Sequence, residues 1–447
     1  MDNKRIVIFG GGTVFHVRSH LALCAPAYGG TAKRLAKLAE EVLPTMDVDL
    51  RLTKMAGGQQ LETNDDIAKD IDEIVKDDVT KVVILSAALC DYVGDVVGGK
   101  SWYRPGAWFG EGPHEETSDF KLTMSDKVGK YNERLKTSDG DQALWLSPAE
   151  KIINRVRKTR KDIFLVAFKT TCGATQEQQY LAGLELCKKS SCNLVFVNDV
   201  TTRLNMIVVP EEATYHITKD REKALRGLLD LVFYRTHLTF TRSSVVGGSP
   251  VPWNSEEVPA NLRTVVNHCI EKNAYKPFNG ATAGHFAVKV KPNEFLSSIR
   301  KTNFNKLEEV GLVRVVTDGP DNVIAFGAKP SVGGQSQRII FNEHPDLDCI
   351  VHFHCPIKEG SEVPVVSQYQ FECGSHECGL NTSNGLKKFG NLSAVYLDNH
   401  GPNIAFNRNI DPQEVIDFIE NNFDLSQKTG GFVSVNSTTD DAIKLLK

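Results

Sequence analysis

The chain has 447 residues, of which 41% are hydrophobic and 24% are charged, and its formal net charge is -4. This balance is typical of a globular protein with a buried core, and it gives no reason to expect a nucleic-acid partner. The length exceeds one ordinary core and predicts two or three domains. The longest apolar run, Val82–Cys90, is far shorter than the roughly 20 residues that cross a bilayer, so no membrane partner is expected.

The lack of a signal-peptide pattern and the cysteine spacing both indicate a cytoplasmic location. No signal-peptide pattern precedes the first apolar run, Ile6–Phe9. The ten cysteines show no secreted-type disulfide framework, and the spacing of Cys373 and Cys378 differs from the Cys-x-x-Cys hook of structural zinc. We therefore expect a cytoplasmic protein with reduced thiols.

The first half begins with a strand, a glycine loop and a helix. Ile6–Phe9 leads into Gly10-Gly11-Gly12-Thr13, and Gly29-Gly30 introduces apolar residues at helical spacing from Thr31 to Val42. Glycines let backbone amides approach a phosphate, and a helix amino terminus favours negative charge. Because the GxGxxG fingerprint is absent, the spacing alone leaves open whether this loop binds a nucleotide.

Further apolar runs in the first half, at Lys81–Ala88, Ile163–Phe168 and Asn193–Val197, alternate with helical patterns. Such runs are typical of buried parallel strands. They predict an α/β domain with a doubly wound, mostly parallel, Rossmann-like sheet.

Five segments of this half resemble, in order, landmarks of phosphopantothenoylcysteine synthetase, the ligase family of coenzyme A biosynthesis. These segments are Gly10–Thr13, Ser86–Tyr92, Arg134–Lys136, Val166–Thr170 and Asn198–Val200. The resemblance covers residues 1–235. It implies a nucleoside triphosphate held by Gly10, Gly11, Gly12, Thr13, Asp91, Lys136, Asn198 and Asp199, with a lysine near Lys136 assisting an acyl-nucleotide step.

One departure from this family concerns its glycine-rich loop, which carries an asparagine expected to stabilise the reaction intermediate. The corresponding stretch, Ser19–Gly30, contains no asparagine. The departure argues against a working ligase. A pocket that still binds a nucleotide and a retained scaffold with a modified pocket both stay open.

A boundary follows the first half. The segment from Thr241 to Trp253 is polar, with paired glycines and spaced prolines, which indicates a linker. We predict domains at residues 1–238 and 255–447, joined by residues 239–254.

The second half begins with a helical pattern from Ser255 to Cys269 and ends with one at Pro412–Asn422. Short apolar runs separated by turns lie between them and predict a mixed, largely antiparallel sheet flanked by helices. The predicted strands are Phe286–Val290, Gly311–Val316, Val323–Phe326, Cys349–Phe353, Ala394–Leu397 and Pro402–Phe406.

Three histidines carry the strongest functional signal. His352 and His354 follow the apolar run Asp348–Val351, and His400 stands in a turn after a later apolar run. Residues i and i+2 of a strand share a face, so the pair can offer two nitrogens to one ion while a later strand end brings the third. Three neutral imidazoles leave an open position for substrate oxygen on zinc. Two ordinary surface histidines are the alternative.

The surroundings of these histidines resemble the class II aldolase/adducin family over residues 255–425. The segments that carry the resemblance are Asn279–His285, Ser298–Leu307, Val351–His354 and Asn399–Gly401. It implies Zn²⁺ or another divalent metal on His352, His354 and His400, stabilising an enediolate. It also implies an anionic substrate group held by Asn279, Gly280, Gly284, His285, Arg300, Lys301 and Ser331, although Arg300 and Lys301 can equally be a solvated pair on a loop.

A second departure concerns proton transfer. Aldolases of this family commonly carry an acid/base glutamate before the histidine pair, where this chain reads Pro330-Ser331-Val332-Gly333-Gly334-Gln335. The local replacements are Glu377, His376 and Tyr369, with Glu372 nearby, and Glu377 can instead be a fourth metal ligand. Each of them can equally be a loop residue bonded to the backbone.

These observations predict a metal-dependent aldehyde-lyase that acts on a small phosphorylated or carboxylated hydroxycarbonyl compound, or a related isomerase or dehydratase. The alternatives are a nucleoside-triphosphate-dependent ligase in the first half and a non-catalytic, adducin-like assembly module. The resemblance also implies a homo-oligomer, such as a tetramer.

Overall fold

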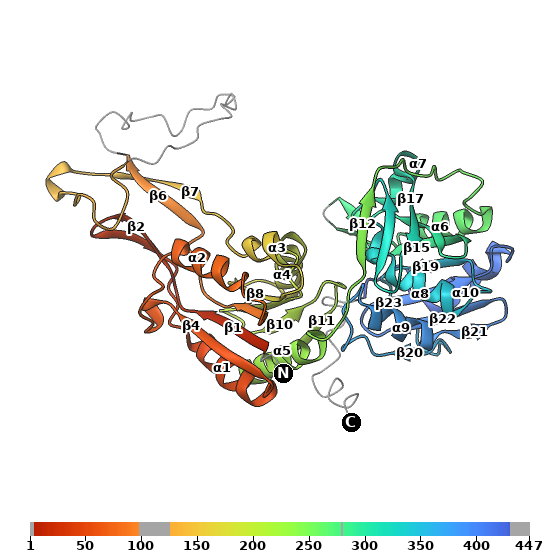
Figure 1. Cartoon of the computed structure of the whole chain (residues 1–447), viewed down its shortest axis with the longest axis horizontal. Coiled ribbons are helices and arrows are strands. Elements are labelled where there is room, and N and C mark those ends of the chain that lie inside the picture. Colours follow the sequence, from red (N-terminus) through yellow and green to blue (C-terminus); the bar gives the residue numbers. More distant parts are fainter. Residues whose placement is uncertain (1–3, 98–125, 279, 430–447) are drawn as a thin grey trace. The chain divides into compact units, whose positions relative to one another are not determined.

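The computed structural model of the chain describes residues 4–97, 126–278 and 280–429 (Figure 1). The chain divides into two compact units, residues 1–168 and 169–447. The division falls inside strand β8 (Phe164–Thr171). The predicted domain boundary at residues 239–254 stays a prediction. Within the described ranges, no helix is both long and apolar enough to cross a membrane.

The first unit is built on parallel strands, as its apolar runs predicted. β1 (Lys4–Gly10) pairs in parallel with β4 (Met46–Leu52) and β5 (Thr80–Leu85), and β5 pairs in parallel with β8. Ile6–Phe9 and Val82–Ile84 are fully buried, which explains why these strands read as continuous apolar runs. The other elements are β2 (Val14–Arg18), β3 (Leu21–Cys24), α1 (Gly30–Val42), η1 (Lys54–Ala56), α2 (Asn64–Ile74), β6 (Tyr92–Val97), η2 (Thr137–Asp139), β7 (Ala143–Pro148) and α3 (Asn154–Thr159).

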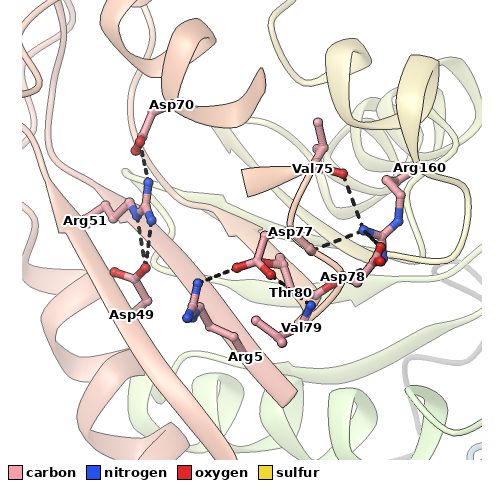
Figure 2. A network of polar contacts seen from close by, with 10 residues as sticks. All are labelled: Arg5, Asp49, Arg51, Asp70, Val75, Asp77, Asp78, Val79, Thr80 and Arg160. Atoms are coloured by element: carbon pink, nitrogen blue, oxygen red, sulfur yellow. Dashed lines mark hydrogen bonds and ion pairs between the residues drawn. The ribbon is translucent and has the colours of Figure 1, made fainter. Parts of the chain in front are cut away.

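Ion pairs join neighbouring elements of this unit at its surface (Figure 2). The guanidinium of Arg51 on β4 contacts Asp49 of the same strand and Asp70 of α2. Arg5 of β1 donates to Asp77 at 2.7 Å, in the turn that leads into β5. These contacts connect β4 to α2, and β1 to the turn before β5, through charged side chains.

The second unit contains an antiparallel group of three strands near its start. β10 (Asn205–Val208) pairs antiparallel with both β9 (Leu194–Asp199) and β11 (Thr214–Thr218). Helices α4 (Gln176–Ser190) and α5 (Arg221–Arg235) precede and follow this group. Both helices have polar amino-terminal caps, since Thr175 accepts from Gln178 N and Asp220 accepts from Lys223 N.

The same unit contains a ten-stranded sheet of order β12-β18-β17-β16-β15-β19-β23-β22-β20, with β21 paired to β22. Its pairs are antiparallel except β12 with β18 and β20 with β22, so the predicted largely antiparallel sheet is confirmed. The strands are β12 (Arg242–Val246), β15 (His285–Lys291), β16 (Glu294–Ser298), β17 (Leu312–Thr317), β18 (Asn322–Phe326), β19 (Cys349–His352), β20 (Val365–Val366), β21 (Lys387–Phe389), β22 (Leu392–Leu397) and β23 (Gly401–Phe406). The remaining elements are α6 (Ala260–Glu271), β13 (Pro277–Phe278), β14 (Ala281–Thr282), η3 (Phe304–Lys306), α7 (Leu307–Val310), η4 (Ser331–Gly334), α8 (Gln335–Glu343), α9 (His376–Gly385) and α10 (Pro412–Asn422).

Helices cover both faces of this sheet. Strand residues alternate between two cores, because Phe286 and Val288 of β15 belong to one cluster and Ala287 belongs to the other. The first cluster includes side chains of α6 and α10, and the second includes Ile340 and Phe341 of α8. The result is a three-layered α/β/α arrangement around the strands that carry the histidines.

All six strands predicted in the second half appear within two residues of the predicted bounds. The sequence pattern missed β16, α8 and α9, and it placed the start of the first helix at Ser255 where α6 begins at Ala260 after Pro259. The segment 239–254 contains β12, which pairs with β18 over Arg242–Val246. Its serines and valines are exposed except for the half-buried Ser243, and they form no apolar run, so they give a strand little local signal.

Candidate metal centre

Three neighbouring strands bring the histidines to one end of the ten-stranded sheet. His285, the first residue of β15, lies opposite His352, the last residue of β19, and His352 lies opposite Asn403 of β23. His354 follows β19 by two residues, and His400 directly precedes β23. Phe353, between the paired histidines, belongs to the core cluster. The alternation of side chains between two faces, predicted for His352 and His354, therefore continues past the end of β19.

The three predicted ligands converge. One ligand nitrogen from each of His352, His354 and His400 lies within 4.8 Å of the others, and the three side chains are buried. The Nε2 atoms of His352 and His400 are 3.3 Å apart. Zinc–nitrogen bonds of about 2.05 Å at a tetrahedral angle place two ligand nitrogens about 3.3 Å apart. This separation and the donor set fit a divalent ion of the zinc type.

The orientation of His352 is set by its backbone contact. Its Nδ1 lies 2.7 Å from the carbonyl oxygen of Pro402. A carbonyl oxygen only accepts, so Nδ1 carries the proton and Nε2 presents its lone pair. This is the arrangement that a metal-binding imidazole requires.

Burial keeps the imidazoles of His352, His400 and His285 neutral. It lowers the pKa of His352 well below the usual value, and His400, His285 and His354 add to this effect. Burial likewise lowers the pKa of His400 well below its usual value, assisted by His354 and His285. For His285, burial and then His354 lower the pKa to about 3. Neutral rings keep their lone pairs available at neutral pH.

Two glycines allow the backbone segments around the histidines to approach each other. Gly401, beside His400, has φ +151°, and a Cβ there would lie 2.1 Å from the carbonyl oxygen of Phe353. Gly284, before His285, has φ +114°, and a Cβ there would lie 2.5 Å from the carbonyl oxygen of His352. Both positions require glycine because of space and of backbone conformation.

A buried carboxylate that was not predicted from the sequence lies beside His354. Glu212, in the turn between β10 and β11, has its Oε2 atom 3.7 Å from Nδ1 of His354. Burial alone would raise the pKa of Glu212, but Lys188, His354 and Lys428 hold it well below the usual value. The signal available in the sequence was the acidic pair Glu211-Glu212 between two apolar strands, which is also ordinary turn composition.

The predicted substrate-binding segments meet at the same end of the sheet. Thr282 N donates to Thr302 O at 3.0 Å, Ile299 forms a β-bridge with Pro330, and Ser298 Oγ donates to Ser331 Oγ at 2.9 Å.

These contacts join three loops. The first holds Gly280, Gly284 and His285, the second holds Arg300 and Lys301, and the third holds Ser331. The side chains of Arg300 and Lys301 are exposed, and Lys301 has a left-handed φ of 62°. Asn279 lies outside the described residues. The substrate-binding role of all seven residues stays a prediction.

The predicted acid/base residues have other partners in this structure. The Tyr369 hydroxyl lies 2.7 Å from Nε2 of His216, and His376 Nδ1 accepts from Gln335 Nε2 at 2.8 Å. Glu377 accepts from both the amide and the hydroxyl of Thr239.

Over residues 4–97, 126–278 and 280–429, no hydrogen bond joins these three residues to the histidine cluster. The nearby Glu372 accepts from Asn193 Nδ2 at 2.9 Å. The catalytic role of these residues stays a prediction.

The glycine loop of the first unit is tightly packed. A Cβ at Gly10 would lie 2.1 Å from that of Ala32, and one at Gly12 would lie 2.0 Å from Ala25 O. The amide of Gly12 donates to Ala27 O, the amide of Thr13 donates to Ala88 O, and the Thr13 hydroxyl donates to Asn64 Oδ1. Two of the amides expected at a phosphate therefore have protein acceptors. Close packing explains why Gly10 and Gly12 are glycines, and Gly11 has a positive φ of +101°.

The other predicted nucleotide residues differ in their surroundings. Asp91 and Lys136 are exposed, and Asp91 forms an ion pair with Lys151 at 2.6 Å. Asn198 accepts from Thr170 Oγ1. Asp199 accepts from the amides of Gly173, Ala174, Thr201 and Thr202. These four hydrogen bonds anchor the loops at the end of β9.

Comparison with known proteins follows the two halves of the chain. Residues 266–358 match the family described as Class II Aldolase and Adducin N-terminal domain. No curated protein matches the chain. The second half resembles the class II aldolase/adducin family, and the first half resembles phosphopantothenoylcysteine synthetases, as predicted.

Among solved structures, the chain is similar to the DNA/Pantothenate Metabolism Flavoprotein from Streptococcus pneumoniae, with 21% identity, a TM-score of 0.41, and coverage of 52% of this chain and 98% of that chain. It is similar to the C-terminal domain of Coenzyme A biosynthesis bifunctional protein CoaBC, with 15% identity, a TM-score of 0.35, and coverage of 51% and 93%. It is also similar to L-fuculose 1-phosphate aldolase, with 17% identity, a TM-score of 0.29, and coverage of 37% and 83%.

Proposed function

We propose that the chain is a metal-dependent aldehyde-lyase of the class II aldolase type, acting on a small phosphorylated or carboxylated hydroxycarbonyl compound. The observation that carries this proposal is the buried cluster of His352, His354 and His400, whose ligand nitrogens lie within 4.8 Å of one another. The family match over residues 266–358 supports it, because the first two of these histidines lie inside the matched range.

A divalent ion, zinc in the first place, would polarise a carbonyl oxygen and stabilise the negative charge that develops there when a neighbouring carbon–carbon bond breaks. The residues of the chain would hold and orient the reactants. His352, fixed by its contact with Pro402 O, would offer Nε2 as a ligand. The loops that carry Gly280, Arg300 and Ser331 would bind the anionic end of the substrate through amides, hydroxyls and cations.

Proton transfer in this proposal belongs to Glu377, His376 or Tyr369. Glu377 is bonded to Thr239, so it reaches a substrate only if that contact opens.

Metal analysis tests the proposal. Purified full-length protein is expected to contain a stoichiometric divalent ion, and His352→Ala is expected to lose it. His344→Ala is the matched control, since His344 bonds Ser383 and lies outside the cluster. Equal metal content in the wild-type protein and the His352→Ala variant would contradict the assignment.

For the first half we propose a scaffold that binds a nucleoside triphosphate at the loops carrying Gly11, Asp91 and Lys136. Thermal stabilisation of the full chain by a magnesium nucleoside triphosphate tests this part separately. A small-molecule substrate, a homo-oligomeric assembly and a cytoplasmic location complete the proposal.

A further inference from the structure

Glu212 has an unusual setting for a turn residue. It has a left-handed φ of 68° and is only 4% exposed. Its carboxylate lies 2.8 Å from Nζ of Lys428 and 3.3 Å from Nζ of Lys188. A buried carboxylate is tolerated only when cations or donors compensate its lost hydration. Two lysines from distant parts of the chain supply that compensation and hold the carboxylate in place.

The carboxylate faces a candidate metal ligand whose second ring nitrogen has no backbone acceptor. Nδ1 of His354 is buried and has no hydrogen-bond partner in the described part of the chain, and Glu212 Oε2 is 3.7 Å away. In the same cluster, the carbonyl oxygen of Pro402 already serves Nδ1 of His352 at 2.7 Å. A small rotation of the His354 ring would bring its Nδ1–H within hydrogen-bond distance of Glu212.

Resting on the proposed metal function, we infer that Glu212 is a positioning residue of the metal centre. Its carboxylate accepts the Nδ1 proton of His354, which fixes the tautomer and turns the Nε2 lone pair toward the ion. Residues that hold the second nitrogen of a metal-binding histidine typically change metal affinity 10–100-fold when they are removed.

Glu212 and His354 lie in segments that resemble different families. Glu212 belongs to the segment that resembles the synthetase, residues 1–235, while His354 belongs to the aldolase-like segment. Glu211 and Arg235, from the same synthetase-like segment, form a fully buried ion pair, and Arg235 donates to the carbonyl oxygen of Tyr369. The metal centre therefore takes a supporting residue from outside the aldolase-like part of the chain.

Lys428 and Thr429 reinforce the same arrangement. Thr429 N donates to His354 O at 3.1 Å, and the Thr429 hydroxyl donates to His400 O. Lys428, the preceding residue, reaches Glu212. One short stretch thus contacts the backbone of two ligand histidines and the carboxylate.

The test measures the affinity of full-length protein for Zn²⁺ and Co²⁺ by competition with a chelator. Glu212→Ala is expected to bind either ion 10–100-fold more weakly. Glu212→Gln keeps an acceptor oxygen and is expected to recover part of this loss. The d–d absorption spectrum of bound Co²⁺ is expected to change in Glu212→Ala, because the geometry of one ligand changes.

Glu211→Gln is the matched control, since Glu211 lies in the same turn, is also buried and pairs with Arg235 rather than with a histidine, and the amide keeps an acceptor oxygen for Arg235. Lys428→Ala is a second variant that leaves the turn intact and is expected to give a smaller loss. If Glu212→Ala binds metal like the wild type, or if Glu211→Gln weakens binding as much as Glu212→Ala does, the inference is wrong. If the wild type itself binds no ion, the proposed function fails and the inference with it.

Discussion

At the residue scale, the burial of His285 makes the stability of the chain depend on pH. Its ring lies 4.8 Å from that of His352, centroid to centroid, and its buried Nδ1 has no hydrogen-bond partner among the described residues. Burial lowers its pKa from 6.5 to about 3, so the folded chain keeps it neutral where the unfolded chain would bind a proton. Its contribution to stability is therefore fully present above pH 6.5 and is lost as the pH falls toward 3.

We predict that metal-free protein loses about 2 kcal/mol of stability through His285 between pH 8 and pH 5. Urea unfolding at both pH values measures this loss. His285→Asn is expected to show a smaller decrease than the wild type, with the remainder due to His352 and His400. An identical pH dependence in wild type and variant would show that His285 is protonated freely in the folded state.

At the element scale, the start of β23 positions His400 because the chain passes close to the end of β19. Gly401 makes this approach possible, as a Cβ there would overlap the carbonyl oxygen of Phe353. The register of β23 against β19, with Asn403 opposite His352, then places the two imidazoles side by side.

We predict that Gly401→Ala lowers stability by about 2 kcal/mol or more and weakens metal binding, since backbone strain and overlap displace His400. Gly360→Ala is the control: Gly360 also has a positive φ, of 81°, but a Cβ added there would meet nothing within 4 Å. Chemical unfolding and chelator competition on both variants separate two effects: the backbone strain of a residue with positive φ, and the overlap of an added Cβ with the carbonyl oxygen of Phe353. Equal effects of the two substitutions would contradict the role given to Gly401.

At the scale of the whole molecule, the buried side chain of Arg235 links segments that resemble different families. Arg235 of α5 pairs with Glu211 at 2.6 Å, and both side chains are fully buried. Arg235 also donates to the carbonyl oxygen of Tyr369, and the Tyr369 hydroxyl meets His216. Removing one partner of such a pair leaves an uncompensated buried charge.

We predict that Arg235→Ala lowers the free energy of unfolding by roughly 3–5 kcal/mol. The double variant Arg235→Met with Glu211→Leu is expected to lose less, because no charge is then left unpaired. Urea unfolding followed by circular dichroism provides the comparison. A double variant less stable than Arg235→Ala would show that the pair itself, and not the unpaired charge, dominates.

Much of the candidate centre was predictable from local patterns. The apolar runs before His352 and after His400 predicted strands, and strand periodicity together with a turn predicted three convergent imidazoles. The mostly parallel and the largely antiparallel sheets followed from continuous apolar runs in the first half and short runs between turns in the second. These features depend on residues close together in the sequence, whose spacing limits where their side chains can point.

Other features depended on contacts between residues far apart in the chain. Glu212 meets His354 across more than a hundred residues, and Glu377 is bonded to Thr239 instead of facing the histidines. Asp199, predicted to hold a nucleotide, accepts from four backbone amides. Sequence alone determined which side chains could bind a metal, because ligand chemistry and strand period are local. The tertiary structure decided which carboxylates accompany them, because burial and partner choice arise only when distant segments pack together.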